Sequence, residues 1–132
     1  MAWTIYDYVH PTHGNLMRPW CDRLQAKEKA KLDFKVDALE KHGTDLIPGM
    51  VAPTGTPAIF KLKVQGVVKL RPMLCEGPRD KVSFTFLIGA KEVQWQYEPA
   101  DAPAVAADYR RDLIANPQRR EAHERINLKT EE

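Results

Sequence analysis

The stretch IFKLKVQGVVKLRPML, residues 59–74, alternates apolar and cationic residues on either side of a Gln65-Gly66 turn. A period of two is typical of β-strands that bury one face and expose the other. We therefore expect two strands, over residues 59–64 and 67–74, that pair as a hairpin around this turn. In that register Lys61 lies near Lys69. The pairing gathers four cations on one face of the sheet: Lys61, Lys63, Lys69 and Arg71.

Patterns on either side of this stretch predict the remaining elements. Short strands are expected over residues 3–9 and 92–97, and a central strand over 82–88, where apolar residues occupy both faces. Apolar residues at helical spacing predict helices over 17–25 and 27–42, which form a hairpin or one bent rod. Residues 44–58, rich in Pro and Gly, read as a loop. Asp101 and Pro103 are typical of a helix start, and a short basic helix is expected over 118–127.

This order of elements predicts an α+β fold. The expected architecture is a small twisted antiparallel sheet of three to five strands, backed on one face by the N-terminal helical hairpin and the C-terminal helices. A chain of 132 residues with 43% hydrophobic and 29% charged residues suits one globular domain, residues 1–132.

Composition also limits the classes of function. No basic leader or run of roughly 18 apolar residues is present, so neither a secretory signal nor a membrane span is expected. Two cysteines are too few for a disulfide framework, which favours a cytoplasmic setting. Among the four histidines, only His10 and His13 lie close together in the sequence. A zinc site needs three or four ligands, so no metal or other cofactor is expected. Gly-rich phosphate loops and Gly-x-Ser-x-Gly elbows are absent from the sequence.

The charge is concentrated rather than evenly spread. The formal net charge is +2, yet residues 59–91 carry seven basic residues against two acidic ones, a surplus of +5. Four cations on one sheet face repel each other unless a polyanion lies there, but lysine and arginine are also common on solvated faces, and the charges alone leave both interpretations open. The basic segment at residues 119–125 also has two interpretations: a patch that binds phosphate, or a solvated helix with weak ion pairs.

Several short motifs together resemble a known family. They are LEKHG at residues 39–43, FKLK at 60–63, KLRP at 69–72 followed by FTFL at 84–87, AADYRR at 106–111 and RREAHER at 119–125. In order and spacing they resemble the RelE/ParE superfamily of small toxins, especially its HigB-like, phage-derived branch, over about residues 16–126. Lys61 stands where that family usually has an acidic residue, and Lys91 is followed by Glu92 rather than by a second lysine.

The resemblance implies a RelE-like fold, a twisted antiparallel sheet backed by helices. It also implies a toxin of a type II toxin–antitoxin system that acts as a metal-independent endoribonuclease on mRNA, associated with the ribosome. A cognate antitoxin protein is then a partner. Members of the ParE kind instead inhibit DNA gyrase by binding, and a non-catalytic, phage-derived interaction protein with the same fold is a further alternative.

RNA cleavage by the adjacent 2′-hydroxyl needs phosphate-binding cations, proton transfer and base positioning. Under the resemblance we expect catalytic roles for Arg71, Lys63 and His123, the last as general acid or base because histidine titrates near neutral pH. Trp95 and Tyr97 are expected to stack bases. The remaining phosphate-binding candidates are Lys61, Lys69, Lys91, Arg119 and Arg120.

Overall fold

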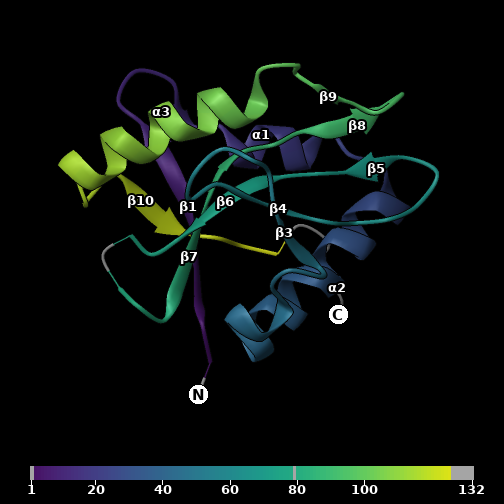
Figure 1. The fold of residues 1–132 in the computed structure, drawn as a ribbon, viewed down its shortest axis with the longest axis horizontal. Coiled ribbons are helices and arrows are strands. Elements are labelled where there is room, and N and C mark those ends of the chain that lie inside the picture. Colours follow the sequence, from purple (N-terminus) through teal and green to yellow (C-terminus); the bar gives the residue numbers. More distant parts are fainter. Residues whose placement is uncertain (1, 79, 126–132) are drawn as a thin grey trace.

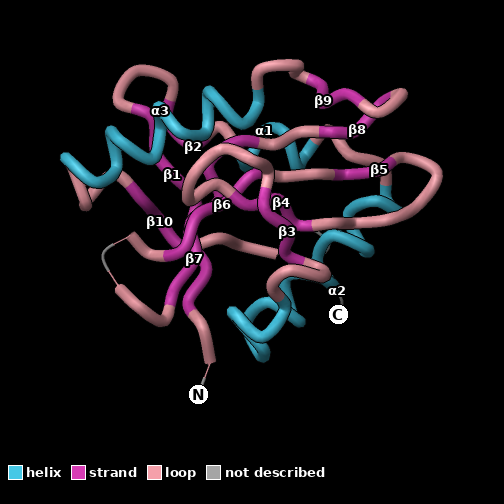
Figure 2. Tube along the Cα trace, in the orientation of Figure 1, coloured by secondary structure: helices cyan, strands magenta, loops and turns pink. Residues whose placement is uncertain are grey.

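The computed structural model describes residues 2–78 and 80–125 of the 132-residue chain, and within them the fold is α+β, as expected. The larger sheet is bigger than predicted, because the described residues place seven strands in it rather than three to five. Its order is β10-β1-β7-β6-β4-β3, with β2 paired to β1 (Figures 1 and 2). The bounds are β1 Thr4–His10, β2 Gly14–Asn15, β3 Val51–Pro53, β4 Phe60–Leu62, β6 Met73–Glu76, β7 Ser83–Ile88 and β10 Arg120–Ala122.

A second, smaller sheet stands beside the first and was not predicted as a separate unit. Its order is β5-β8-β9, with β5 Lys69–Leu70, β8 Lys91–Val93 and β9 Gln96–Glu98, all antiparallel. The predicted strand 67–74 divides at residues 71–72 between this sheet and β6 of the larger one.

The predicted pairing of residues 59–64 with 67–74 exists in part, but β4 pairs with β6 rather than with β5, and the register differs from the expected one. Lys61 pairs with Met73, and Val64 bridges to Leu70. Both pairs belong to one register, so the loop that joins the two segments, the hairpin tip, spans residues 65–69 rather than only Gln65 and Gly66. Lys61 was predicted to lie opposite Lys69, and this prediction is wrong. The shift is an even number of residues, so Leu62 and Val64 stay on the buried face, and the longer tip lets Lys69–Leu70 pair with β8 instead.

The strand β7 lies at the centre of the larger sheet, as its apolar pattern predicted. Residues Ser83 to Leu87 are all buried, and the two hydroxyls among them are hydrogen-bonded: Ser83 Oγ donates to Asp80 O (2.9 Å) and Thr85 Oγ1 to Gly77 O (2.6 Å). Its neighbour β1 runs parallel to it, so the sheet is mixed rather than antiparallel throughout.

Helices cover both faces of the larger sheet, whereas one covered face was expected. They are α1 Met17–Asp22, α2 Ala26–His42 and α3 Ala102–Ala115, with a 3₁₀ turn η1 at Gly43–Leu46. One core joins α1 and α2 to residues such as Phe84 and Phe86, and the other joins α3 to Met73 and Leu87. Figure 1 shows α2 and α3 on opposite sides of the strands. Both faces of β7 are buried, with Phe84 and Phe86 in the core of α1 and α2 and Leu87 in the core of α3, so each face needs a covering helix.

The expected basic helix over residues 118–127 is wrong in the part that the structure describes. Arg120–Ala122 instead form β10, which pairs antiparallel with β1 and ends the larger sheet. This segment lacks an apolar stripe that could hold a helix against the core, whereas the open edge of β1 offers it backbone partners. Residues 126 and 127 of the expected helix lie outside the described residues.

Candidate nucleic-acid interface

Several predicted site residues gather where β4 meets the smaller sheet, on a surface that we call the lysine–aromatic face. Its members come from β4, from the hairpin tip and β5, and from β8, β9 and the turn between them. They are Lys61, Lys63, Lys69, Arg71, Glu92, Trp95 and Tyr97. Cations and aromatic rings from separate segments of the chain therefore meet on one surface.

The contact between Lys61 and Tyr97 joins the two sheets. Lys61 Nζ donates a hydrogen bond to the Tyr97 hydroxyl (2.9 Å) and lies 5.2 Å from the centre of the ring. Both side chains are half-buried. A cation and a phenol are thus held together at the solvent boundary, where a phosphate oxygen can approach both groups.

Trp95 lies at the outer end of the face and is 89% exposed. It occupies a two-residue turn between β8 and β9 in which Gln94 and Trp95 both have positive φ, 51° and 70°. Asn and Gly are the usual residues in such turns, so the positive φ of a tryptophan here is strained. Because the side chain is exposed, packing in the core does not explain this strain. The strained turn holds a large ring in solvent, with Lys69 Nζ 5.4 Å from its centre.

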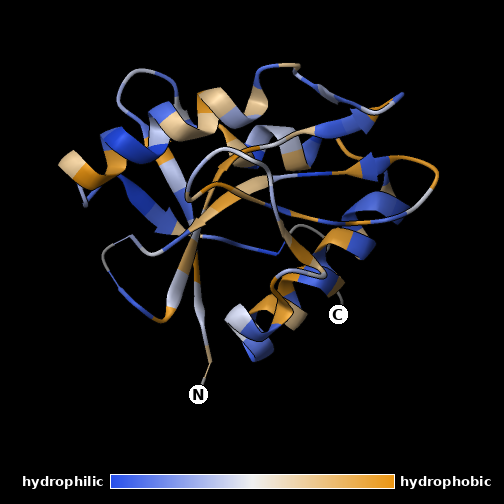
Figure 3. Cartoon of the chain, viewed as in Figure 1, coloured by the Kyte–Doolittle hydropathy of each residue, from blue (hydrophilic) through white to orange (hydrophobic). Residues whose placement is uncertain are grey.

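A shallow cavity of about 430 Å³ adjoins Trp95 and Lys69. Its wall also includes Val67, at the hairpin tip, and Val93, both of which are exposed. Figure 3 shows the loop before β5 as hydrophobic beside the hydrophilic strands β5 and β8. Apolar surface bordered by lysine suits a ligand that presents both flat rings and negative charge.

Arg71 reaches this face but does not present its charge to solvent, contrary to the role expected for it. The residue is only 3% exposed. Its Nε donates to Glu92 Oε1 (3.1 Å), Nη1 to Leu70 O (2.8 Å) and Nη2 to Gln65 Oε1 (3.0 Å). Glu92 also stands between Lys69 and Tyr97 in the strand register. The guanidinium therefore ties the hairpin tip to β8 and is buried away from the solvent side, where a phosphate would bind.

Of the two other lysines predicted for the site, one shares the face and one does not. Lys63 follows Lys61 by two residues on the extended chain, and Leu62 between them is buried on the opposite side. The register places Lys63 beside Arg71. Lys91 lies next to Glu92 in β8 and so points to the other side, where it lines a cavity with Trp20.

The C-terminal candidates Arg119, Arg120 and His123 lie at the opposite edge of the larger sheet and do not join the lysine–aromatic face. Arg119 is ion-paired with Asp112. Arg120 pairs with Asp80 (2.8 Å) and lies over the Tyr6 ring. These cations are therefore already used within the fold.

His123 is buried rather than poised for catalysis, with its side chain 2% exposed. Its Nδ1 lies 2.8 Å from Asp7 Oδ1, its ring packs on Phe86, and its Nε2 has no partner among the described residues. Asn15 Nδ2 donates to the other oxygen of Asp7 (3.0 Å). A lone aspartate in an apolar strand is the sequence signal that could have indicated this internal pair.

Metal chemistry and membrane insertion receive no support from the described residues. Within residues 2–78 and 80–125, His, Cys, Asp and Glu form no group of three that could hold a metal ion. His10 Nδ1 instead accepts backbone hydrogen bonds from Thr12 and His13, with the two imidazole rings stacked. The helices of this part of the chain are too short or too polar to cross a bilayer.

A scan against protein-family models, a search of curated proteins and a search of solved structures each return no match. The family resemblance of the motifs therefore stays a hypothesis.

Proposed function

We propose that the protein binds single-stranded RNA on the lysine–aromatic face and acts there as a metal-independent endoribonuclease. The observation that carries the proposal is the gathering of lysines with the exposed Trp95 ring and the half-buried Tyr97 ring, from three separate segments, at one solvent boundary. Stacking on aromatic side chains and phosphate contacts by lysine are the two interactions that single-stranded nucleic acid recognition needs.

In this proposal a base stacks on Trp95, and the backbone runs inward past Lys69 toward Lys61 and Lys63. Trp95 is free to stack because 89% of its surface is exposed. Double-stranded RNA fits less well, since its bases are already stacked and cannot reach the ring. Discrimination between single and double strands is thus an expected property of the face.

Cleavage follows from the same arrangement. The 2′-oxygen of the bound RNA attacks the adjacent phosphorus and the bond to the 5′-oxygen breaks, which leaves a 2′,3′-cyclic phosphate and a 5′-hydroxyl. Lys61 and Lys63 stabilise the added charge of the phosphorane. Lys61, whose ammonium donates to the Tyr97 hydroxyl, gives a proton to the leaving 5′-oxygen, and the 2′-proton passes to solvent water.

As a toxin, the protein would cleave mRNA at the ribosome and would be neutralised by a cognate antitoxin. Induced expression in bacteria tests this: growth arrest with loss of mRNA supports it. Unimpeded growth with intact mRNA, at confirmed expression of folded protein, contradicts it.

One observation favours a second candidate, RNA binding without cleavage. The arginine best suited to a pentavalent phosphate, Arg71, is fully engaged by Glu92, Gln65 and a backbone carbonyl. An RNA-binding interaction protein needs no such group. A labelled RNA that binds but never yields cyclic-phosphate ends would identify this candidate.

Binding is tested with a fluorescent single-stranded RNA and the triple variant Lys61→Gln, Lys63→Gln, Lys69→Gln. A matched control removes the same charge from helix α2: Lys29→Gln, Lys35→Gln, Lys41→Gln. The face variant is expected to bind at least tenfold more weakly than the control. Equal affinities of the two variants would show that the RNA lies elsewhere or that the interaction is only a response to net charge.

A further inference from the structure

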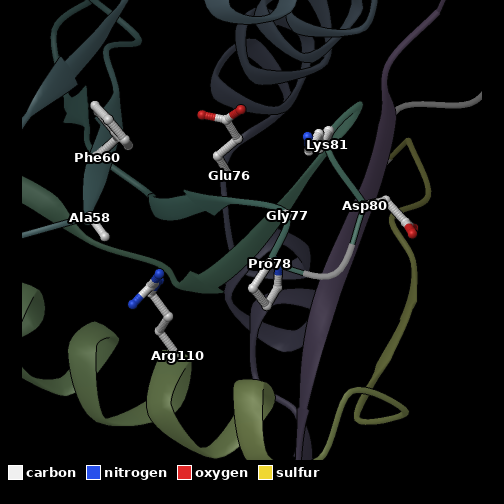
Figure 4. A pocket seen from close by; sticks show the side chains of 8 residues that line it. All are labelled: Ala58, Phe60, Glu76, Gly77, Pro78, Asp80, Lys81 and Arg110. Atoms are coloured by element: carbon white, nitrogen blue, oxygen red, sulfur yellow. The ribbon is translucent and has the colours of Figure 1, made fainter.

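A second cavity, of about 370 Å³, opens between the end of β6, the turn before β4 and helix α3, away from Trp95. Its lining consists of Ala58, Phe60, Glu76, Gly77, Pro78, Asp80, Lys81 and Arg110, and we call it the Arg110 notch. In Figure 4, Phe60, Glu76 and Lys81 lie along one wall, and Arg110 rises from α3 on the opposite wall.

Arg110 differs from the other partly buried arginines of the described chain because it has no carboxylate partner. Arg71, Arg119, Arg120 and Arg125 each form an ion pair with an acid. Arg110 forms none within the residues that the structure describes, and its Nε is buried without a hydrogen-bond acceptor. The Arg110 side chain interacts with the Cys75 thiol, which is a weak hydrogen-bond acceptor. This thiol stays neutral because burial raises its pKa to about 12.

A half-buried guanidinium without a carboxylate partner is a favourable position for an anion, because its remaining donors face the cavity rather than an acid of the fold. The acids of the notch do not fill this role. Asp80 is paired with Arg120 and points away from the opening in Figure 4, and Glu76 lies on the opposite wall without an ion pair to Arg110. The notch therefore presents an open position for an anion beside Arg110.

We propose that the Arg110 notch binds the phosphate monoester of a nucleotide, a site separate from the lysine–aromatic face. Arg110 takes the phosphate, for which a forked guanidinium is well shaped, and Lys81 supplies a second cation at the rim. Phe60 offers a half-buried ring for the base, and the Glu76 carboxylate can accept ribose hydroxyl donors. The cavity volume lies in the range of small-molecule sites, about 300–1,000 Å³.

The proposal is tested by titrating the full-length protein with AMP, adenosine and inorganic phosphate in a calorimeter. We expect AMP to bind at least tenfold more tightly than adenosine, and Arg110→Met to lose at least tenfold in AMP affinity. Arg111→Met, the neighbouring exposed arginine of the same helix, is the control and is expected to bind AMP like the unaltered protein. AMP that fails to bind, or binds Arg110→Met unchanged, overturns the proposal.

Two additions keep the result independent of folding and of the RNA-binding proposal. Lys81→Gln, at an exposed position, is expected to weaken AMP binding severalfold without a change in melting temperature, and unchanged binding counts against the site. RNA carrying a 5′-phosphate presents the same group as AMP, so 5′-phosphorylated and 5′-hydroxyl forms of one oligonucleotide are compared. A preference for the phosphorylated form that Arg110→Met removes assigns the notch to an RNA end, whereas AMP binding without that preference assigns it to free nucleotide.

Discussion

Arg71→Ala should destabilise the protein strongly, because Arg71 holds two parts of the fold together from a buried position. The substitution leaves the Glu92 carboxylate, whose side chain is only 17% exposed, without its cation. It also removes the donors to Leu70 O and Gln65 Oε1. Breaking a buried ion pair by removing one partner costs about 3–5 kcal/mol. The partial exposure of Glu92 favours the lower end, about 3 kcal/mol.

The measurement is urea unfolding, with thermal melting as a second readout. An unfolding entropy of about 2.1 cal/mol/K per residue converts about 3 kcal/mol into a fall of roughly 10 °C in melting temperature for this chain length. Arg111→Ala is the control, since its ion pair with Asp108 is exposed and contributes about 0.5 kcal/mol or less. Arg71→Ala with unchanged stability but abolished RNA cleavage would refute this reasoning and return Arg71 to the catalytic set.

Three further predictions concern groups away from the face. The pKa of Asp112 is lowered first by the hydrogen bond from the Tyr8 hydroxyl (2.5 Å) and then by the hydrogen bond from Arg119. The ionised Asp112 therefore stabilises the fold above about pH 4, and this contribution is lost as the pH falls further. Acid unfolding of Asp112→Asn should lack this loss of stability. Burial raises the pKa of both thiols, Cys21 and Cys75, so a thiol reagent at pH 8 should label neither in the folded protein and both in urea, and rapid labelling of the folded state would contradict the structure. His123→Ala should lower the free energy of unfolding by about 2–4 kcal/mol, because it leaves one oxygen of the buried Asp7 without its partner and opens a cavity beside Phe86, and a loss below about 0.5 kcal/mol would contradict that account.

Local pattern was sufficient to predict the helices and the long strands. The spacing of Leu32, Val36 and Leu39 predicted α2, and all three side chains are buried as that spacing requires. The apolar run in β7 predicted a central strand for the same reason. Both elements are long enough for their own periodicity to outweigh the influence of their neighbours.

Elements whose partners are distant in sequence could not be predicted in the same way. β3 is three residues long and exists because it pairs with β4, and β10 exists because β1 has an open edge. The small sheet β5-β8-β9 likewise depends on a pairing between segments some 20 residues apart. Local propensity carries no information about such pairings.

The site shows the same division. Strand alternation predicted that Lys61 and Lys69 lie on one face, and Trp95 and Tyr97 were expected to stack bases only under the family resemblance. The structure places all four on one surface. What the sequence could not show is that Glu92 neutralises Arg71, because an acid 21 residues away gives no local sign of its partner. For Arg110 the signal is the lack of a carboxylate partner among residues 2–78 and 80–125, which becomes visible only in the three-dimensional structure.

The central claim, that three lysines of one face bind the phosphates of single-stranded RNA, is tested most directly by the salt dependence of RNA affinity. For single strands, the logarithm of the binding constant falls with the logarithm of salt concentration with a slope of about −0.7 per phosphate contact, so contacts by Lys61, Lys63 and Lys69 predict a slope near −2. Replacement of all three by glutamine should bring the slope close to zero. A slope that stays near −2 in that variant would contradict the claim.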